Sequence, residues 1–307
     1  MHRCDLTDPS LIDRITGKPK KILVPILKPE NMGENVSIDD KNIDGVGYTI
    51  LANKETGKII LMMAATKARL VMEALDRIPV GLRMKVKTIS KDLAESYDWV
   101  ARTMFMNATK IADKFHIVKL ALEALQAVRI RYRQIVLTTE RERKESWKKA
   151  GKKVKDLPPA KRYENDETLK EILARSRYLL FRFAGEWNEF QLERAKILFR
   201  EFPEIKQVYD LICSFRNFYK CTVGNKKRAQ ESLEGWFVKA KELKIEEVEN
   251  FVDTVKNNQA QILNYFEEGQ TNAFAESLNA KIQRFIRTNY GVRDTDFFHF
   301  RMMKYFS

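Results

Sequence analysis

The chain has 307 residues, of which 44% are hydrophobic and 32% are charged, a composition typical of a folded globular protein with one or two domains. Its formal net charge of +14 at pH 7 indicates a polyanionic partner and favours nucleic acid over an anionic membrane surface. The sequence shows no run of about 18 apolar residues, no apolar leader and only three scattered cysteines, which predicts a cytosolic protein without a transmembrane helix, a disulfide framework or a cysteine zinc knuckle.

Residues 1–34 contain four prolines and little hydrophobic periodicity, so they are predicted to form an extended arm. The following segment alternates short β-branched runs with amphipathic runs, and a turn ending at Gly57 separates two of the strands. The elements expected in chain order are strands at 34–40, 47–53 and 58–64, a helix at 68–78, a strand at 85–91, a helix at 97–105, a strand at 109–113 and a helix from 115 to about 136.

Three strands followed by strands that alternate with helices indicate a ribonuclease H-like plan, an α/β fold with a mixed five-stranded sheet flanked by helices. Sites in open sheets of this kind form beyond the carboxyl ends of the strands. Asp39 ends the first expected strand and Asp92 follows the fourth, and the topology makes these strands neighbours. The two carboxylates are therefore expected to reach one point, although either acid alone is more often a turn residue.

The segment 129–162 is dense in positive charge, with thirteen lysines and arginines against four acids. Such a run either binds phosphate groups or forms a solvated face, and its share of the total charge favours phosphate. The candidate DNA-binding residues in this segment are Arg141, Arg143, Lys148, Lys149, Lys152 and Lys153.

The pattern after this segment is helical. Its aromatic residues, among them Trp187, Phe190 and Trp236, are expected to form a core. We therefore predict a first part of the catalytic core at 35–132, a basic and helical insertion at 133–269, and a C-terminal part at 270–307 that completes the core. The helices expected in the insertion lie at 169–180, 189–202, 205–219, 225–243 and 245–266.

The last part contains an amphipathic helix with one unusual carboxylate, Glu276. Four apolar residues fall on one side of this helix: Phe274, Leu278, Ile282 and Phe285. The opposite side carries Asn272, Glu276, Asn279, Gln283 and Arg287. A single acid among amides and arginine is either part of a dedicated site or an ordinary exposed glutamate, and the helix alone does not decide between these readings.

Several separated motifs of the chain resemble the ISL3 family of bacterial insertion-sequence transposases. The central motifs are Asp92-Leu-Ala-Glu-Ser-Tyr97 and Asn107-Ala-Thr-Lys-Ile-Ala-Asp113-Lys-Phe115-His116-Ile-Val-Lys119. The C-terminal motifs are Thr271-Asn-Ala273, Glu276-Ser-Leu-Asn279-Ala-Lys-Ile282 and Asn289-Tyr-Gly-Val-Arg293. The similarity covers residues 35–307 with the motifs in the family's order.

The resemblance implies a DDE transposase with two aspartates and one glutamate on a ribonuclease H-like core, and a helical insertion before the glutamate. These acids fall on Asp39, Asp92 and Glu276, with Asp40 as an alternative to Asp39. The resemblance gives Asp113 and His116 a supporting role rather than direct metal ligation. Further candidates come from the Glu276 helix: Asn272 and Asn279 for support, and Arg284 and Arg287 for DNA binding.

A site of three carboxylates suits two Mg²⁺ ions, with Mn²⁺ as a substitute, and the chemistry expected is strand cleavage followed by attack of the freed 3′-hydroxyl on target DNA. The expected partners are double-stranded DNA, further copies of the chain and no membrane. The resemblance implies a zinc ribbon and a helix-turn-helix at the N-terminus, which this sequence lacks, so end recognition is expected either to be lost or to come from a separately encoded DNA-binding protein. The alternatives are a ribonuclease H-like nuclease without strand transfer and a catalytically inactive DNA-binding remnant.

Overall fold

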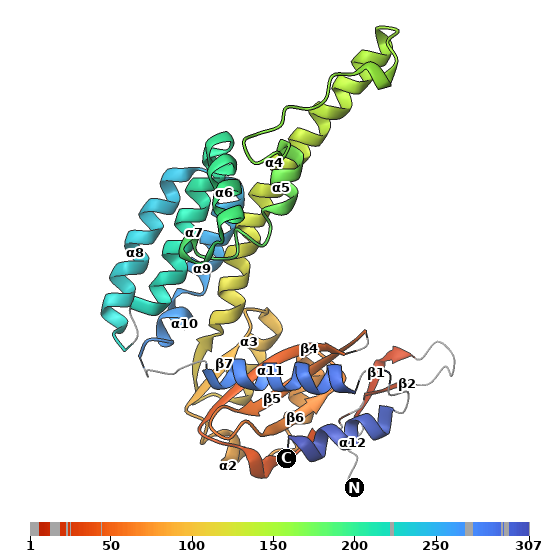
Figure 1. Cartoon of the computed structure of the whole chain (residues 1–307). Coiled ribbons are helices and arrows are strands. Elements are labelled where there is room, and N and C mark those ends of the chain that lie inside the picture. Colours follow the sequence, from red (N-terminus) through yellow and green to blue (C-terminus); the bar gives the residue numbers. More distant parts are fainter. Residues whose placement is uncertain are drawn as a thin grey trace. The chain divides into compact units, whose positions relative to one another are not determined.

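The computed structural model describes residues 6–12, 19–22, 24, 26–43, 45–221, 224–267, 273–289, 291 and 295–306. Contacts between residues divide the chain into two compact units (Figure 1). The first unit contains Met1–His116 and Asn258–Ser307, and the second contains Ile117–Asn257. Among the described residues, no helix is both long and apolar enough to cross a membrane.

The first unit is built on a mixed six-stranded sheet with the strand order β3-β6-β5-β4-β7-β8. Strands β4, β5 and β6 form an antiparallel meander, whereas β7 runs parallel to β4 and β8 runs parallel to β7. The six strands are β3 (Ile26–Leu27), β4 (Asn35–Ile43), β5 (Val46–Asn53), β6 (Ile59–Met63), β7 (Thr88–Lys91) and β8 (Thr109–Ala112). The mixed α/β architecture is therefore the expected one.

The sheet has one strand more than the five predicted from the sequence. The additional strand, β3, comes from the segment expected to be an extended arm, and it pairs with the edge strand β6. Two residues are too few to show an alternating pattern, which is why the sequence did not reveal this strand. The same segment also forms an antiparallel pair, β1 (Leu6–Ile12) with β2 (Pro19–Ile22).

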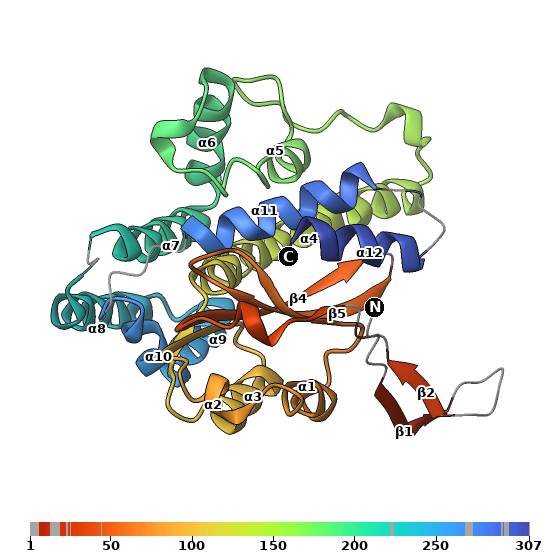
Figure 2. The ribbon, with the colours of Figure 1, turned by 90° about the horizontal axis from the view of Figure 1, so that it is seen from below.

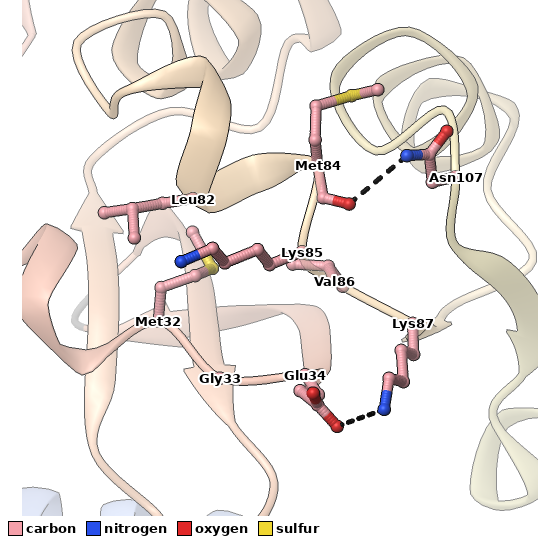
Figure 3. A pocket seen from close by; sticks show the side chains of 9 residues that line it. All are labelled: Met32, Gly33, Glu34, Leu82, Met84, Lys85, Val86, Lys87 and Asn107. Carbon is pink, nitrogen blue, oxygen red and sulfur yellow. Dashed lines mark hydrogen bonds and ion pairs between the residues drawn. The ribbon is translucent and has the colours of Figure 1, made fainter.

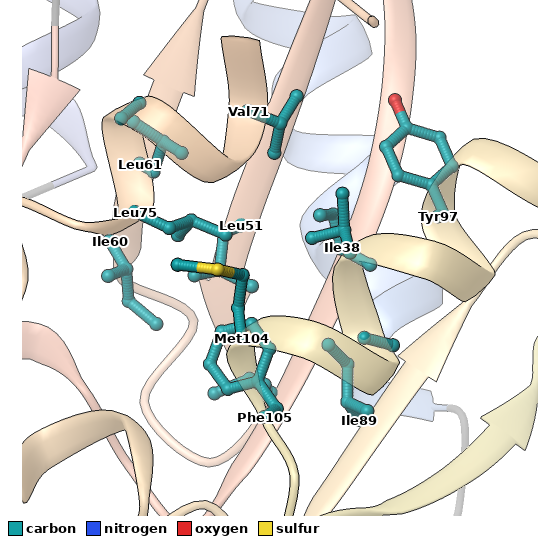
Figure 4. Packing of buried hydrophobic residues seen from close by; sticks show 14 of the residues in the cluster. Ile38, Leu51, Ile60, Leu61, Val71, Leu75, Ile89, Tyr97, Met104 and Phe105 are labelled. Carbon is teal, nitrogen blue, oxygen red and sulfur yellow. The ribbon is translucent and has the colours of Figure 1, made fainter. Parts of the chain in front are cut away.

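Three helices cover one face of the sheet: α1 (Ala68–Leu75), α2 (Val80–Arg83) and α3 (Glu95–Met104) (Figure 2). The apolar face of α1 and α3 packs on alternate residues of β4 to β7, and Ile38, Leu51 and Phe105 are fully buried there (Figure 4). Each such side chain contributes about 1.5–3 kcal/mol by leaving water. This cluster therefore holds β4 and β7 in place, the two strands that lead to the predicted acids.

Helices α11 (Ala273–Thr288) and α12 (Thr295–Tyr305) cover the opposite face (Figure 2). Ile282 and Phe285 of α11 are buried in a cluster that includes Ile50 of β5 and Met62 of β6. The apolar side predicted for this helix is confirmed at these two positions. The side chains of Phe274 and Leu278 lie outside the described part of the chain.

The second unit is helical, as expected. Its helices are α4 (Lys114–Lys149), α5 (Leu169–Arg175), α6 (Glu189–Glu201), α7 (Pro203–Cys221), α8 (Lys226–Leu243) and α9 (Glu246–Asn257). Phe215 and Trp236 lie at its centre with their ring centroids 4.8 Å apart, and Phe251 packs edge-on against Phe215. Phe190, expected in this core, is instead 76% exposed.

Three helices of this region differ in length from the predictions, and one of them, α5, ends at Arg175 instead of near residue 180. Helix α4 continues to Lys149 instead of ending near residue 136, because lysine, arginine and glutamate favour helix and no breaker occurs before Gly151, whose φ is +73°. The single helix expected at 245–266 is broken at Asn258, so that α9 is followed by the short helix α10 (Gln259–Asn264) of the first unit.

Short 3-10 helices complete the described elements. They span Pro29–Asn31, Val154–Asp156 and Ala184–Glu186.

Candidate active site

Asp39 and Asp92 lie side by side on neighbouring parallel strands, at the level where β7 ends. Asp39 does not end its strand as expected, because β4 continues to Ile43 in its pairing with β5. Ile38 of β4 is the register partner of Lys91 of β7, and Asp39 and Asp92 each follow directly after these two residues. Both strands run in the same direction, so Asp39 within β4 and Asp92 just after β7 lie at the same level. The structure therefore places together the first two acids that the sequence selected.

His116 of α4 lies between these two carboxylates and contacts both. Its Nε2 atom is 3.2 Å from Oδ1 of Asp39, and its Nδ1 atom is 3.3 Å from Oδ1 of Asp92. An imidazole donates from both nitrogens only when it carries two protons, so this arrangement suits the cationic form. One side chain thus joins two acids that come from different strands.

The charges around this contact reinforce one another. Burial raises the pKa of Asp39, but the hydrogen bond from His116 and the charge of Lys41 outweigh burial and hold the pKa at about 2. The ammonium of Lys41 is 2.9 Å from Oδ2 of Asp39. Burial lowers the pKa of His116, but the nearby carboxylates outweigh it and raise that pKa above its usual range. The cationic imidazole is therefore favoured at this position.

Asp113 sets the start of the helix that carries His116. Its Oδ1 atom accepts a hydrogen bond of 2.8 Å from the Phe115 backbone N–H, which is the arrangement of a helix N-cap. The Asp113 side chain is buried, and burial raises its pKa. Asp113 therefore acts on the position of His116 through the backbone, in keeping with a supporting role.

Asp39, and not the neighbouring Asp40, is the acid of β4 whose carboxylate contacts His116. Successive strand residues point to opposite faces, and Asp40 is the register partner of Thr49, whose hydroxyl lies 3.1 Å from the Tyr97 hydroxyl on the face covered by α3. Asp39 is the partner of Ile50, which lies on the face covered by α11. The helix that carries Glu276 is thus on the same side of the sheet as Asp39.

The backbone of Glu276 lies within α11, but its side chain is outside the described part of the chain. The same holds for the side chain of Asn279, and Asn272 lies outside the described residues altogether. Farther along the helix, Arg284 and Arg287 are exposed, as expected for the polar side.

Lys91 is part of the site, and sequence reasoning missed it. The side chain is 1% exposed, and its ammonium lies 3.1 Å from Oδ1 of Asp98 and donates to the backbone carbonyl of Asp92 at 3.3 Å. Asp98 also accepts hydrogen bonds from Arg102 at 2.6 Å and from Gln261 at 3.1 Å. A lysine at the end of a strand is usually exposed, and no local pattern distinguishes this one.

The candidate DNA-binding residues of the basic segment are all exposed: Arg141, Arg143, Lys148, Lys149, Lys152 and Lys153. The beginning of the segment is different. Arg129 is buried and donates to the carbonyl of Leu173, and Arg131 forms ion pairs with Glu204 and Glu247. These two arginines stabilise the helical unit, so the exposed positive charge begins farther along α4.

A pocket of about 450 Å³ lies at the other end of the parallel strands (Figure 3). Its lining includes Met32 and Leu82, together with Glu34, Lys87 and Asn107, which precede β4, β7 and β8. The carboxylate of Glu34 is paired with Lys87 at 2.7 Å. Glu34 is the one carboxylate among the described residues that line this pocket, so the pocket lacks the paired acids found at Asp39 and Asp92.

The carboxylate oxygens of Asp39 and Asp92 suit a hard cation, because Mg²⁺ prefers carboxylate oxygens and water. Within the described residues, however, no group of three histidine, cysteine, aspartate or glutamate side chains is placed to hold a metal ion. Asp39 and Asp92 supply two carboxylates, and both contact His116. A complete site needs a further donor, and α11 carries Glu276 on the same side of the sheet.

Comparison with known proteins identifies one family. The family model of the ISL3 type, described as a transposase, matches residues 36–302, which is most of the chain. No curated protein and no solved structure matches the chain.

Proposed function

The chain belongs to the ISL3 transposase family, and from this premise we propose that it catalyses Mg²⁺-dependent cleavage of DNA at the ends of an insertion sequence and transfer of the freed strand to target DNA. The proposal includes a ribonuclease H-like core interrupted by the helical segment. The observation that carries it is the contact of one histidine with both Asp39 and Asp92, which lie at the same level of the neighbouring parallel strands β4 and β7.

In this proposal Asp39, Asp92 and Glu276 hold two Mg²⁺ ions, for which Mn²⁺ can substitute. The bound ions would activate the attacking oxygen and stabilise the leaving oxygen of an in-line displacement. The alternation of β4 and the packing of α11 support this set of acids, because both direct Asp39 and the Glu276 helix to one face. No residue of the chain needs to form a covalent bond to DNA in this reaction.

The residues around the acids would act on position and charge. His116 holds the carboxylates of Asp39 and Asp92 toward each other, and Asp113 holds His116 by capping α4. Lys91 holds the backbone at Asp92. Rigid placement of this kind matters because catalytic groups that are slightly misplaced lose much of their effect.

The exposed cations would bind the DNA backbone. Lys148, Lys149, Lys152 and Lys153 lie at the end of α4 and in the turn that follows it, and Arg284 and Arg287 lie on the exposed side of α11. Contacts with phosphates position DNA without reading its sequence, so these residues would serve element ends and target alike. We also propose that further copies of the chain bind the paired element ends and that a separately encoded DNA-binding protein takes part in recognising them.

Incubation of the protein with a plasmid and duplexes that carry the inverted repeats flanking its gene tests this function. Joined products between a duplex end and the plasmid, formed only with Mg²⁺ or Mn²⁺, are the expected result. Cleavage without joined products would identify a nuclease instead. DNA binding without any cleavage would identify an inactive remnant.

A further inference from the structure

An exposed phenylalanine, Phe115, directly precedes the histidine that contacts the two acids. Phe115 is in the first turn of α4, where the backbone bond to Asp113 fixes it, and its side chain is 56% exposed. The ring meets the imidazole of His116 edge to face, with centroids 5.7 Å apart and planes at 89°. The imidazole that contacts this ring is also the one that contacts the carboxylates of Asp39 and Asp92.

A single exposed apolar residue is ordinary, but the surroundings of Phe115 are not. Its ring contacts the imidazole of His116, which is bound in turn to two carboxylates, so an exposed apolar ring lies next to a charged group. The acids and the ions proposed to bind there would act on the phosphodiester, and they offer no surface on which a base can stack. An aromatic face adds the one contact that a nucleobase can make regardless of its identity, because every base has a π-face.

We propose that Phe115 is a stacking platform for an unpaired nucleobase next to the phosphodiester on which Asp39 and Asp92 act. This inference rests on the proposed function, because it assumes that DNA binds at Asp39 and Asp92. A base inside a duplex is already stacked on both sides, so the platform accepts only a base at an end, in an overhang or turned out of the helix. Phe115 would thereby hold the strand open at the bond to be cut.

Binding to two duplexes that differ only in a short 3′ thymidine overhang tests the platform, with 2-aminopurine placed at the junction as a fluorescent base. The wild-type chain is expected to bind the overhang duplex about 5-fold or more tightly than the blunt one, which is the range measured for stacking of one base. Phe115→Ala should bind both duplexes equally and at the level of the blunt duplex, with no change in 2-aminopurine fluorescence. Phe115→Trp should keep the preference.

Phe190→Ala is the matched control, because it removes an exposed phenyl ring from the helical unit and should behave like the wild type. The platform is disproved if Phe115→Ala keeps the full preference for the overhang, or if the wild type shows none. Failure of the proposed function gives a different result. The wild type would then neither cleave nor join duplexes that carry the flanking repeats, whether or not it prefers overhangs.

Discussion

The ammonium of Lys91 lies 3.1 Å from the carboxylate of Asp98, and the lysine side chain is 1% exposed. This pair joins the end of β7, which leads into Asp92, to the first turn of α3. A buried ion pair contributes little net stability against an apolar pair, yet removal of one partner leaves an uncompensated buried charge. The pair is therefore better understood as a device that fixes the backbone at Asp92.

Asp98→Ala should destabilise the first unit more than Lys91→Met. The first variant leaves a buried ammonium without its carboxylate, at a cost of roughly 3–5 kcal/mol, whereas the second replaces the lysine with an apolar side chain of similar length. Unfolding in urea measures both values. Glu34→Ala is the control, because the Glu34–Lys87 pair is largely exposed and should change stability little. Equal losses in Asp98→Ala and Glu34→Ala would contradict this account.

Asp92→Asn and Glu276→Gln should each abolish strand transfer and leave DNA binding intact, because the amides keep the size of the acids and lose the charge that holds Mg²⁺. The loss should exceed the roughly 100-fold that removal of an outer-shell partner costs a metal site. Gel analysis of joined products and filter binding of DNA provide the two measurements. Asp40→Asn is the matched control at an exposed neighbouring acid and should remain active. Activity in either of the first two variants would refute the assignment of ligands.

Replacement of Lys148, Lys149, Lys152 and Lys153 by glutamine should weaken DNA binding to the same extent for all sequences. Each phosphate contact that is lost should reduce the slope of log K against log salt by about 1. Fluorescence anisotropy at several salt concentrations measures this slope. The control replaces Lys239, Lys241 and Lys244, which are exposed near the end of α8. A slope equal to that of the wild type would show that the end of α4 is only a solvated face.

Glu167 should make the helical unit sensitive to acid. Burial raises its pKa, but hydrogen bonds from Arg194 and Arg175 outweigh burial and hold the pKa at about 2. A depressed pKa contributes stability that is present above the unfolded value of 4.5 and is lost as the pH falls toward 2. Glu167→Gln should therefore lower the free energy of unfolding by roughly 1.5–3 kcal/mol at neutral pH.

The difference between wild type and Glu167→Gln should shrink between about pH 4.5 and pH 2, because the wild-type carboxylate becomes protonated in that range. Denaturant titrations at a series of pH values measure this convergence. Glu164→Gln provides the control, since the Glu164–Arg200 pair is exposed on both sides. A difference that stays constant down to pH 2 would show that the ion pairs of Glu167 do not stabilise the fold.

The sequence by itself determined the order of the main strands and helices, the pairing of Asp39 with Asp92 and the apolar side of α11. Each follows from a local pattern: alternation in β4, the position of an acid directly after β7, and the helical spacing of Ile282 and Phe285. Such patterns predict the structure because they show which face of a helix or strand is buried on folding. They do not state which side chains from different elements will touch.

Only the tertiary structure decided the contacts between side chains around Asp39 and Asp92. It placed His116 between Asp39 and Asp92, buried Lys91 against Asp98, and turned Asp40 toward the α3 face. It also showed that Arg129 of the basic segment is buried and that β3 belongs to the sheet. The physical reason is common to these cases: a charged or short segment shows no periodicity of its own, so its position depends on partners that are distant in the sequence and adjacent only after folding.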